Sequence, residues 1–263
     1  MDISELLDGL NDKQREAVAA PLGNYLVLAG AGSGKTRVLT HRIAWLIAVE
    51  NISEGNIMAV TFTNKAAAEM RHRIQDTLSK HAQPNLFGMW IGTFHSIAHR
   101  LLRAHHLDVN LPQDFQILDS EDQLRLVKRL MKLHNYDDKA FPPKQACWYI
   151  NNKKDEGLRP QDIDDFGDRQ EKEWIKIYQI YQDTCDRAGL VDFAELLIRA
   201  YELFAKKPVI LQRYQQRFQH ILVDEFQDTN KIQYAWIKIL AGNTGKVMIV
   251  GDDDQSIYGW RGA

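Results

Sequence analysis

Residues 29–36, with the sequence AGAGSGKT, have the composition of a loop that holds a phosphate chain. Glycines allow backbone N–H groups to curve round an anion, and the start of a following helix adds positive charge. Lys35 would reach the β- and γ-phosphates, and the Thr36 hydroxyl would hold Mg²⁺. Because an apolar run precedes the segment and a helical pattern follows it, a nucleotide site is favoured over a glycine-rich turn with a solvated lysine. The predicted phosphate-binding residues are Ala29, Gly30, Ala31, Gly32, Ser33, Gly34, Lys35 and Thr36.

The acidic pair Asp224 and Glu225 is the second candidate group, and it directly follows an apolar run. Alone, such a pair would most often mark a helix start. Beside a phosphate loop, the aspartate can hold Mg²⁺ and the glutamate can polarise an attacking water. Ligands bind at the carboxyl edge of open parallel sheets, where both segments would lie. The two segments together predict an ATP-hydrolysing site in which Lys35, Asp224 and Glu225 are catalytic, with Thr36 and Asp224 as metal ligands.

Five short apolar runs are expected to form the strands that position these groups. They are continuous and rich in β-branched residues, which is typical of parallel strands covered on both faces. The first two are followed by amphipathic helical patterns, so strand and helix alternate as in a doubly wound α/β sheet. The predicted strands are residues 25–29, 57–62, 89–93, 220–223 and 246–250.

The interval between the third and fourth runs is too long for a simple crossover. Residues 96–219 exceed several-fold the roughly 30 residues of a βαβ unit. The interval carries helical stripes with the capping-box spacing at Ser120 and Asp192, and the stripe after Asp192 includes Phe193. We therefore predict an α/β domain with an inserted all-helical subdomain. The predicted division is 1–109 for the first part of the α/β domain, 110–215 for the helical insertion and 216–263 for the second part.

Composition limits the classes of protein that fit. A chain of 263 residues with 44% hydrophobic and 26% charged residues can bury a core. The formal charge of −2 does not indicate a nucleic-acid binder, so any such contact must come from a local surface. Cys147 and Cys185 are too few for a disulfide framework or a four-ligand zinc site. Since neither a signal peptide nor an apolar run of ~18 residues occurs, we expect a soluble, cytoplasmic protein.

Further segments accompany these two motifs along the chain. In chain order the set is 10–17 (LNDKQREA), 29–36, 61–67 (TFTNKAA), 92–96 (GTFHS), 224–228 (DEFQD) and 251–263 (GDDDQSIYGWRGA). Their types and order resemble the UvrD/Rep/PcrA family of superfamily 1 DNA helicases. The resemblance implies a RecA-like P-loop domain, the family's 1A core, with the insertion as its 1B subdomain. Within the family, residues 113–159 look closer to the UvrD branch than to the Rep branch.

The resemblance also implies roles for single residues. Gln14 would read the adenine edge, and Gln255 would sense the γ-phosphate. Arg37 and Arg73 would be ATP-site residues, although each could equally be a solvated helix residue. The implied contacts to single-stranded DNA are Phe62, Thr93, His95, Tyr258, Trp260 and Arg261. Exposed aromatic side chains can stack on unpaired bases irrespective of sequence, whereas a lone aromatic or histidine is more often a packing residue.

The basic residues outside these motifs are harder to assign. By the same resemblance, Lys153 and Lys154 are candidates for contact with duplex DNA, because the inserted domain of such helicases leans toward it. The basic group within residues 99–106 is interpreted as a solvated helix face.

By resemblance, the expected function is ATP-driven 3′–5′ DNA unwinding in nucleotide excision and mismatch repair. The implied partners are single-stranded DNA, its junctions with duplex, and repair proteins. A second motor domain would complete the ATP site with arginines, so the 263-residue chain alone is expected to be poorly active. Two alternatives remain open: a P-loop ATPase acting on proteins or small molecules, and a module that only binds nucleotide or a partner.

Overall fold

The computed structural model describes residues 4–30, 32–79 and 86–252. Its centre is a parallel five-stranded sheet in the order β1-β7-β6-β2-β3. The strands are β1 (Tyr25–Leu28), β2 (Ile57–Thr61), β3 (Trp90–Thr93), β6 (His220–Val223) and β7 (Lys246–Gly251). Each predicted strand is present with ends within one residue of those expected. The α/β class with a parallel sheet is confirmed.

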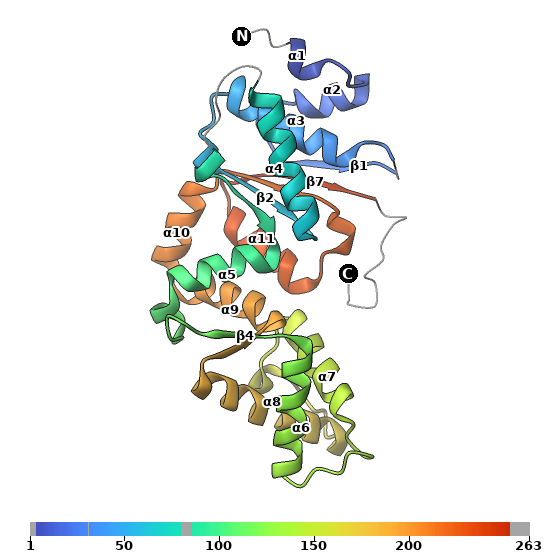
Figure 1. The fold of residues 1–263 in the computed structure, drawn as a ribbon, viewed down its shortest axis with the longest axis vertical. Helices are drawn as coiled ribbons and strands as arrows, with labels where there is room; N and C mark the ends of the chain where they lie inside the picture. The colour runs from blue at the N-terminus through green and yellow to red at the C-terminus, as the bar shows by residue number, and fades with distance from the viewer. Residues whose placement is uncertain (1–3, 31, 80–85, 253–263) are drawn as a thin grey trace.

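Helices cover both faces of this sheet (Figure 1). One face is covered by α3 (Lys35–Ala48) and α4 (Asn64–Ser79). The other is covered by α5 (Phe94–Ala104), α9 (Phe193–Lys206), α10 (Pro208–Arg217) and α11 (Lys231–Ala241). Two short helices, α1 (Ser4–Leu7) and α2 (Asp12–Val18), lie beside α3. None of the helices in the described ranges is both long and apolar enough to cross a membrane.

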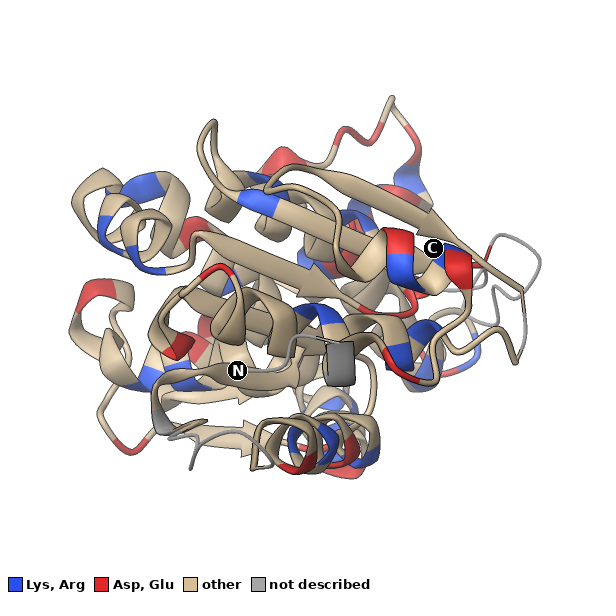
Figure 2. Ribbon diagram, turned by 90° about the horizontal axis from the view of Figure 1, so that it is seen from above, with Lys and Arg blue, Asp and Glu red and all other residues tan. Residues whose placement is uncertain are grey.

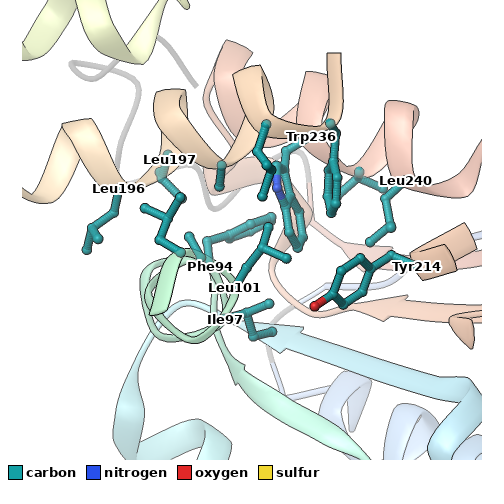
Figure 3. Packing of buried hydrophobic residues seen from close by; sticks show 14 of the residues in the cluster. Phe94, Ile97, Leu101, Leu196, Leu197, Tyr214, Trp236 and Leu240 are labelled. Carbon is teal, nitrogen blue, oxygen red and sulfur yellow. The ribbon is translucent and has the colours of Figure 1, made fainter. Parts of the chain in front are cut away.

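Strand β2 shows why both faces must be covered. Successive strand residues point to opposite faces, and Ile57 and Ala59 pack with one cluster while Met58 and Val60 pack with the other. All four are fully buried. On the second face, aromatic and aliphatic side chains from α5, α9, α10 and α11 interdigitate round Trp236 (Figure 3). This packing fixes the strand ends, and therefore the residues that follow them.

The insertion forms a separate lobe below the sheet in Figure 1. Its core joins α6 (Ser120–Leu133), α7 (Pro143–Asp155) and α8 (Arg169–Ala188). Two three-residue strands that the sequence did not reveal, β4 (Gln116–Leu118) and β5 (Leu190–Asp192), pair in parallel, so the lobe is not helical throughout. The short 3₁₀ turns are Glu54–Asn56, Leu86–Gly88, His106–Val109, Pro160–Asp162 and Phe226–Asp228.

The packing suggests a narrower insertion than the predicted range 110–215. Helices α9 and α10 fall within that range, but Leu197, Phe204 and Tyr214 are buried in the cluster against the sheet. We therefore propose that the insertion covers residues 116–192, from β4 to β5, and that α9 and α10 belong to the α/β domain.

Capping at the two predicted helix starts had different outcomes. Asp192 caps α9 as expected, because its side chain accepts a hydrogen bond from Glu195 N. The predicted Ser120 cap is wrong: Asp119 caps α6 by accepting from two backbone N–H groups. Gln123 instead exchanges hydrogen bonds with the Asn151 amide. Aspartate and serine are both good N-caps, so the sequence cannot decide which of two adjacent candidates caps the helix. The course of the backbone decides it.

Candidate functional site

Residues 29–34 connect β1 to α3, which begins at Lys35, at the carboxyl edge of the sheet. Figure 2 shows the molecule from above, with the strands seen along their length and the charged residues coloured. Ala29 N donates to Gly251 O over 3.1 Å, and Gly34 precedes α3 with φ 83°. A Cβ on Gly34 would lie 2.8 Å from Gln14 Nε2 and would displace that side chain, and the positive φ itself favours glycine here. At Gly30 a Cβ would meet nothing within 4 Å, which leaves open space along the loop. Ala31 lies outside the described residues.

Lys35 lies against the loop that precedes it. Its side chain is 7% exposed, and Nζ donates to Ala29 O over 3.0 Å. The same ammonium is 3.5 Å from Asp252 Oδ2, so a residue at the end of β7 faces the loop. A buried ammonium requires anionic or carbonyl partners. Phosphate oxygens entering the loop would meet this charge directly.

Thr36 and Asp224 are brought together from positions 188 residues apart. The Thr36 hydroxyl donates to Asp224 Oδ2 over 3.0 Å, and Asp224 is 3% exposed. Burial raises the pKa of Asp224 to about 6, opposed by the hydrogen bond from Thr36. Hydroxyl and carboxylate oxygens are ligands that Mg²⁺ accepts, and a cation would favour the ionised carboxylate. The two side chains therefore fit the predicted metal site.

Glu225 is held beside this pair by a residue that sequence reasoning did not single out. Gln227 Nε2 donates to Glu225 Oε2 over 2.6 Å, and Gln227 Oε1 accepts from Asp252 N over 3.0 Å. Gln227 thus links the acidic pair to the loop after β7, where Asp252 pairs with Lys35. Glu225 itself has φ 51°, a left-handed conformation that is costly for a residue with a side chain. Gln227 could have been found from the sequence only because it lies within the 224–228 segment.

The other predicted ATP-site residues lie in three different settings. Gln14 reaches the phosphate loop, since Nε2 donates to Ser33 O over 2.8 Å while Oε1 accepts from Asn11 N. Arg37 is exposed on the first turn of α3. Arg73 is exposed on α4 and pairs with Glu69 one turn earlier. Their roles toward a nucleotide stay predictions.

The three predicted DNA contacts within the described residues line one groove of about 570 Å³. Phe62 is half-buried and meets Phe94 edge-on at 5.7 Å between ring centroids. Thr93 is buried, and its hydroxyl caps α5 by accepting from Ser96 N. His95 is half-buried at the same rim. The remaining predicted residues, Gln255, Tyr258, Trp260 and Arg261, lie outside the described residues.

Two exposed aromatic residues that the sequence did not mark also line the groove. Phe193 is 48% exposed and meets the His95 ring edge-on at 6.1 Å, and Trp148 on α7 is 55% exposed. The apolar stripe of α9 predicted that Phe193 is a core residue. Its position directly after the Asp192 cap, at the very start of the helix, was the signal that it could be exposed. No lysine or arginine is among the described residues that line the groove, which include the amides Gln123, Asn151, Asn152 and Gln233.

The prediction that Lys154 contacts duplex DNA is wrong. Its side chain is 0% exposed, and Nζ lies 2.7 Å from Asp192 Oδ2 and 2.9 Å from Glu195 Oε2. Burial acts to lower the pKa of Lys154, but the two carboxylates raise it overall. Lys153 is 21% exposed beside Glu171, and its contact with DNA stays a prediction.

Comparison with known proteins agrees with this geometry. Residues 10–263 match the UvrD/REP helicase N-terminal domain family. The whole chain is 92% identical to DNA helicase II of Haemophilus influenzae and 72% identical to DNA helicase II of Escherichia coli. It is 43% identical over 264 aligned positions to the ATP-dependent DNA helicase PcrA of Leuconostoc citreum. The chain spans 36% of the length of the first two relatives and 35% of the third. The family resemblance is thereby confirmed: the chain belongs to the UvrD/REP helicase N-terminal domain family.

Proposed function

We propose that this chain is the nucleotide-binding and strand-holding part of an ATP-dependent DNA helicase. One observation carries the proposal. Strands β2 and β6 are neighbours, Val60 pairs with Val223, and Asp224 N donates to Val60 O. One residue beyond these pairs, β2 enters the groove at Thr61 and β6 reaches the nucleotide site at Asp224. Adjacent strands lie about 4.8 Å apart, so a shift at one site reaches the other directly.

In the nucleotide site each side chain has a role that follows from its charge. Lys35 neutralises phosphate oxygens, and Glu225, oriented by Gln227, accepts the proton of the attacking water. Thr36 and Asp224 would hold Mg²⁺, which supplies positive charge for the transferred phosphate. Each role needs the folded sheet edge, because the loop and the acidic pair are far apart in the chain.

In the groove, aromatic rings offer stacking surfaces for unpaired bases. Phe62 and His95 lie on the α/β side, and Phe193 and Trp148 extend the same lining. Base stacking on an aromatic residue contributes about 1–3 kcal/mol and tolerates any sequence. The lining has no lysine or arginine among the described residues and includes Asp155 and Asp228, so it suits bases better than phosphates. A translocating motor requires this tolerance, since it must bind every sequence that it passes.

The finer parts of the proposal rest on the family. We infer 3′–5′ movement along single-stranded DNA, action at junctions with duplex, and work in nucleotide excision and mismatch repair with repair proteins as partners. We also infer a cytoplasmic location, and a second motor domain whose arginines complete the ATP site. The names of the relatives, DNA helicase II and ATP-dependent DNA helicase PcrA, support DNA helicase activity and ATP dependence, and the other inferences rest on the family resemblance.

The test is ATP hydrolysis by the purified full-length protein as single-stranded DNA is titrated. DNA should stimulate hydrolysis, and Lys35→Ala should abolish it. Phe193→Ala should raise the DNA concentration that gives half-maximal stimulation. Phe166→Ala is the matched control, because Phe166 is 91% exposed and lies outside the groove. Absence of stimulation by DNA would instead favour an ATPase that acts on proteins or small molecules.

A non-catalytic module is the other alternative. In that case Lys35→Ala would leave the survival of cells exposed to DNA damage unchanged. We expect the variant to be as sensitive as a deletion.

A further inference from the structure

Three arginines gather at the outer edge of β3, the last strand of the sheet. The Arg100 guanidinium lies 4.4 Å from the centre of the Trp90 ring, and that of Arg217 lies 5.3 Å from it. Arg71 donates to Ile91 O on the same strand over 3.0 Å. They come from three helices, α5, α10 and α4, so tertiary packing alone brings them together.

These positive charges are not balanced by nearby carboxylates. Arg71 and Arg217 donate to backbone carbonyls, and within the described part of the chain none of the three arginines forms a salt bridge. Arg100 is exposed on the surface of α5. Partial burial first, and then repulsion from Arg217 and Arg71, lower its pKa. Like charges held together without a counter-charge destabilise a fold, so the arrangement favours an anion.

The ring between these arginines carries an unmet hydrogen-bond donor. Trp90 is 5% exposed, and its Nε1 has no hydrogen-bond partner among the residues that the structure describes. Buried N–H groups without partners are rare, and each requires an explanation. The Nε1 atom is buried, so a ligand from outside would meet the exposed Arg100 guanidinium instead. A guanidinium beside two further positive charges favours a ligand that offers acceptor oxygens and negative charge, which is the chemistry of a phosphate group.

Arg100 and Trp90 of the cluster lie on two elements whose other ends line the groove. The groove has no lysine or arginine among its described lining residues, so a strand whose bases enter it must find cations outside. Helix α5 leads from His95 in the groove to Arg100, about 7.5 Å further along its axis. Likewise, β3 leads from Thr93 in the groove to Trp90, about 10 Å away.

We propose that Arg100, supported by Arg71 and Arg217, binds backbone phosphates of single-stranded nucleic acid where the strand leaves the groove. This rests on the proposed function, because it assumes that the groove holds unpaired bases. It also changes the interpretation of residues 99–106 as a merely solvated face. In that segment Arg103 is engaged by the carbonyls of Gln113 and Phe115, whereas Arg100 remains available for an anion.

The test is the salt dependence of single-stranded DNA affinity in the purified full-length protein. Each bound phosphate adds about 0.7 to the slope of log affinity against log salt concentration for single strands. Arg100→Gln should therefore lower the slope by about 0.7 for each phosphate that it no longer neutralises, and Arg100→Lys should retain most of the slope. Oligonucleotides long enough to extend beyond the groove should bind Arg100→Gln more weakly than the wild type. Oligonucleotides that only fill the groove should bind both proteins equally well. Arg129→Gln, an exposed arginine on α6, is the control for net charge.

The outcomes separate this proposal from the proposed function. Loss of affinity in Phe193→Ala with an unchanged slope in Arg100→Gln would overturn the phosphate site alone. No effect from either variant would overturn both. If Arg100→Gln kept the wild-type slope but lost binding to a polyglutamate peptide, the site would serve an acidic protein segment, and the proposal would be wrong.

Discussion

Replacing Lys154 by methionine should lower the free energy of unfolding by about 3–5 kcal/mol, the usual cost of removing one partner from a buried ion pair. The Lys154 ammonium is fully buried, 2.7 Å from Asp192 and 2.9 Å from Glu195. Without Lys154, Glu195 still has the guanidinium of Arg159 at 2.7 Å. Asp192 is therefore the carboxylate that the loss of the ammonium affects most. Within the part of the chain that the structure describes, Asp192 retains only neutral donors such as the Tyr181 hydroxyl. The loss should therefore fall near the lower end of that range.

The same change should reach the groove. Asp192 caps α9 by accepting a hydrogen bond from Glu195 N over 2.7 Å, and Phe193 is the next residue. A carboxylate deprived of its cation will seek solvent and disturb this first turn. Single-stranded DNA affinity should fall in Lys154→Met even though the residue lies outside the groove lining.

A double-mutant cycle in urea provides the measurement. Asp192→Asn removes the charge but keeps an oxygen that can cap α9, so the double variant should lose less stability than the two single losses added. Lys153→Met is the control on the same helix. Its ammonium is partly exposed and 3.6 Å from Glu171, so the expected loss is under about 1 kcal/mol. Equal effects of Lys153→Met and Lys154→Met, or strict additivity in the cycle, would refute the reasoning.

Two further predictions concern single positions. Gly34→Ala should cost about 1–3 kcal/mol in unfolding experiments and weaken nucleotide binding, because φ is 83° and the new Cβ would displace Gln14. Gly30→Ala is the control for stability alone, because a Cβ there meets no protein atom and the free energy of unfolding should change little. Burial, with the charges of Lys246 and Arg42, lowers the pKa of His220 to about 4 from an ordinary 6.5. The folded state thus binds fewer protons than the unfolded state between these values, so stability should fall as pH drops from about 6.5 towards 4. Urea unfolding of His220→Leu should show a flatter pH dependence, and an unchanged dependence would contradict this assignment.

The sequence by itself determined the local features of this protein. Apolar runs of the right length and composition placed all five strands of the central sheet within one residue. The AGAGSGKT loop and the Asp224–Glu225 pair were predictable because their chemistry depends on residue type and on neighbours in the chain. The Asp192 cap was predictable for the same reason, since a cap is satisfied within one helical turn.

Tertiary structure decided what depends on contact between distant segments. Thr36 meets Asp224 across 188 positions, and Gln227 reaches Asp252 from the next strand end. The same packing buried Lys154, which the family resemblance had made a candidate for contact with duplex DNA, and left Phe193 exposed at the groove. Local patterns report which face of an element is apolar, but whether a charge is buried or an aromatic exposed depends on the element packed against it. That partner is chosen by the whole fold, because burial is a property of the assembled surface and not of any segment.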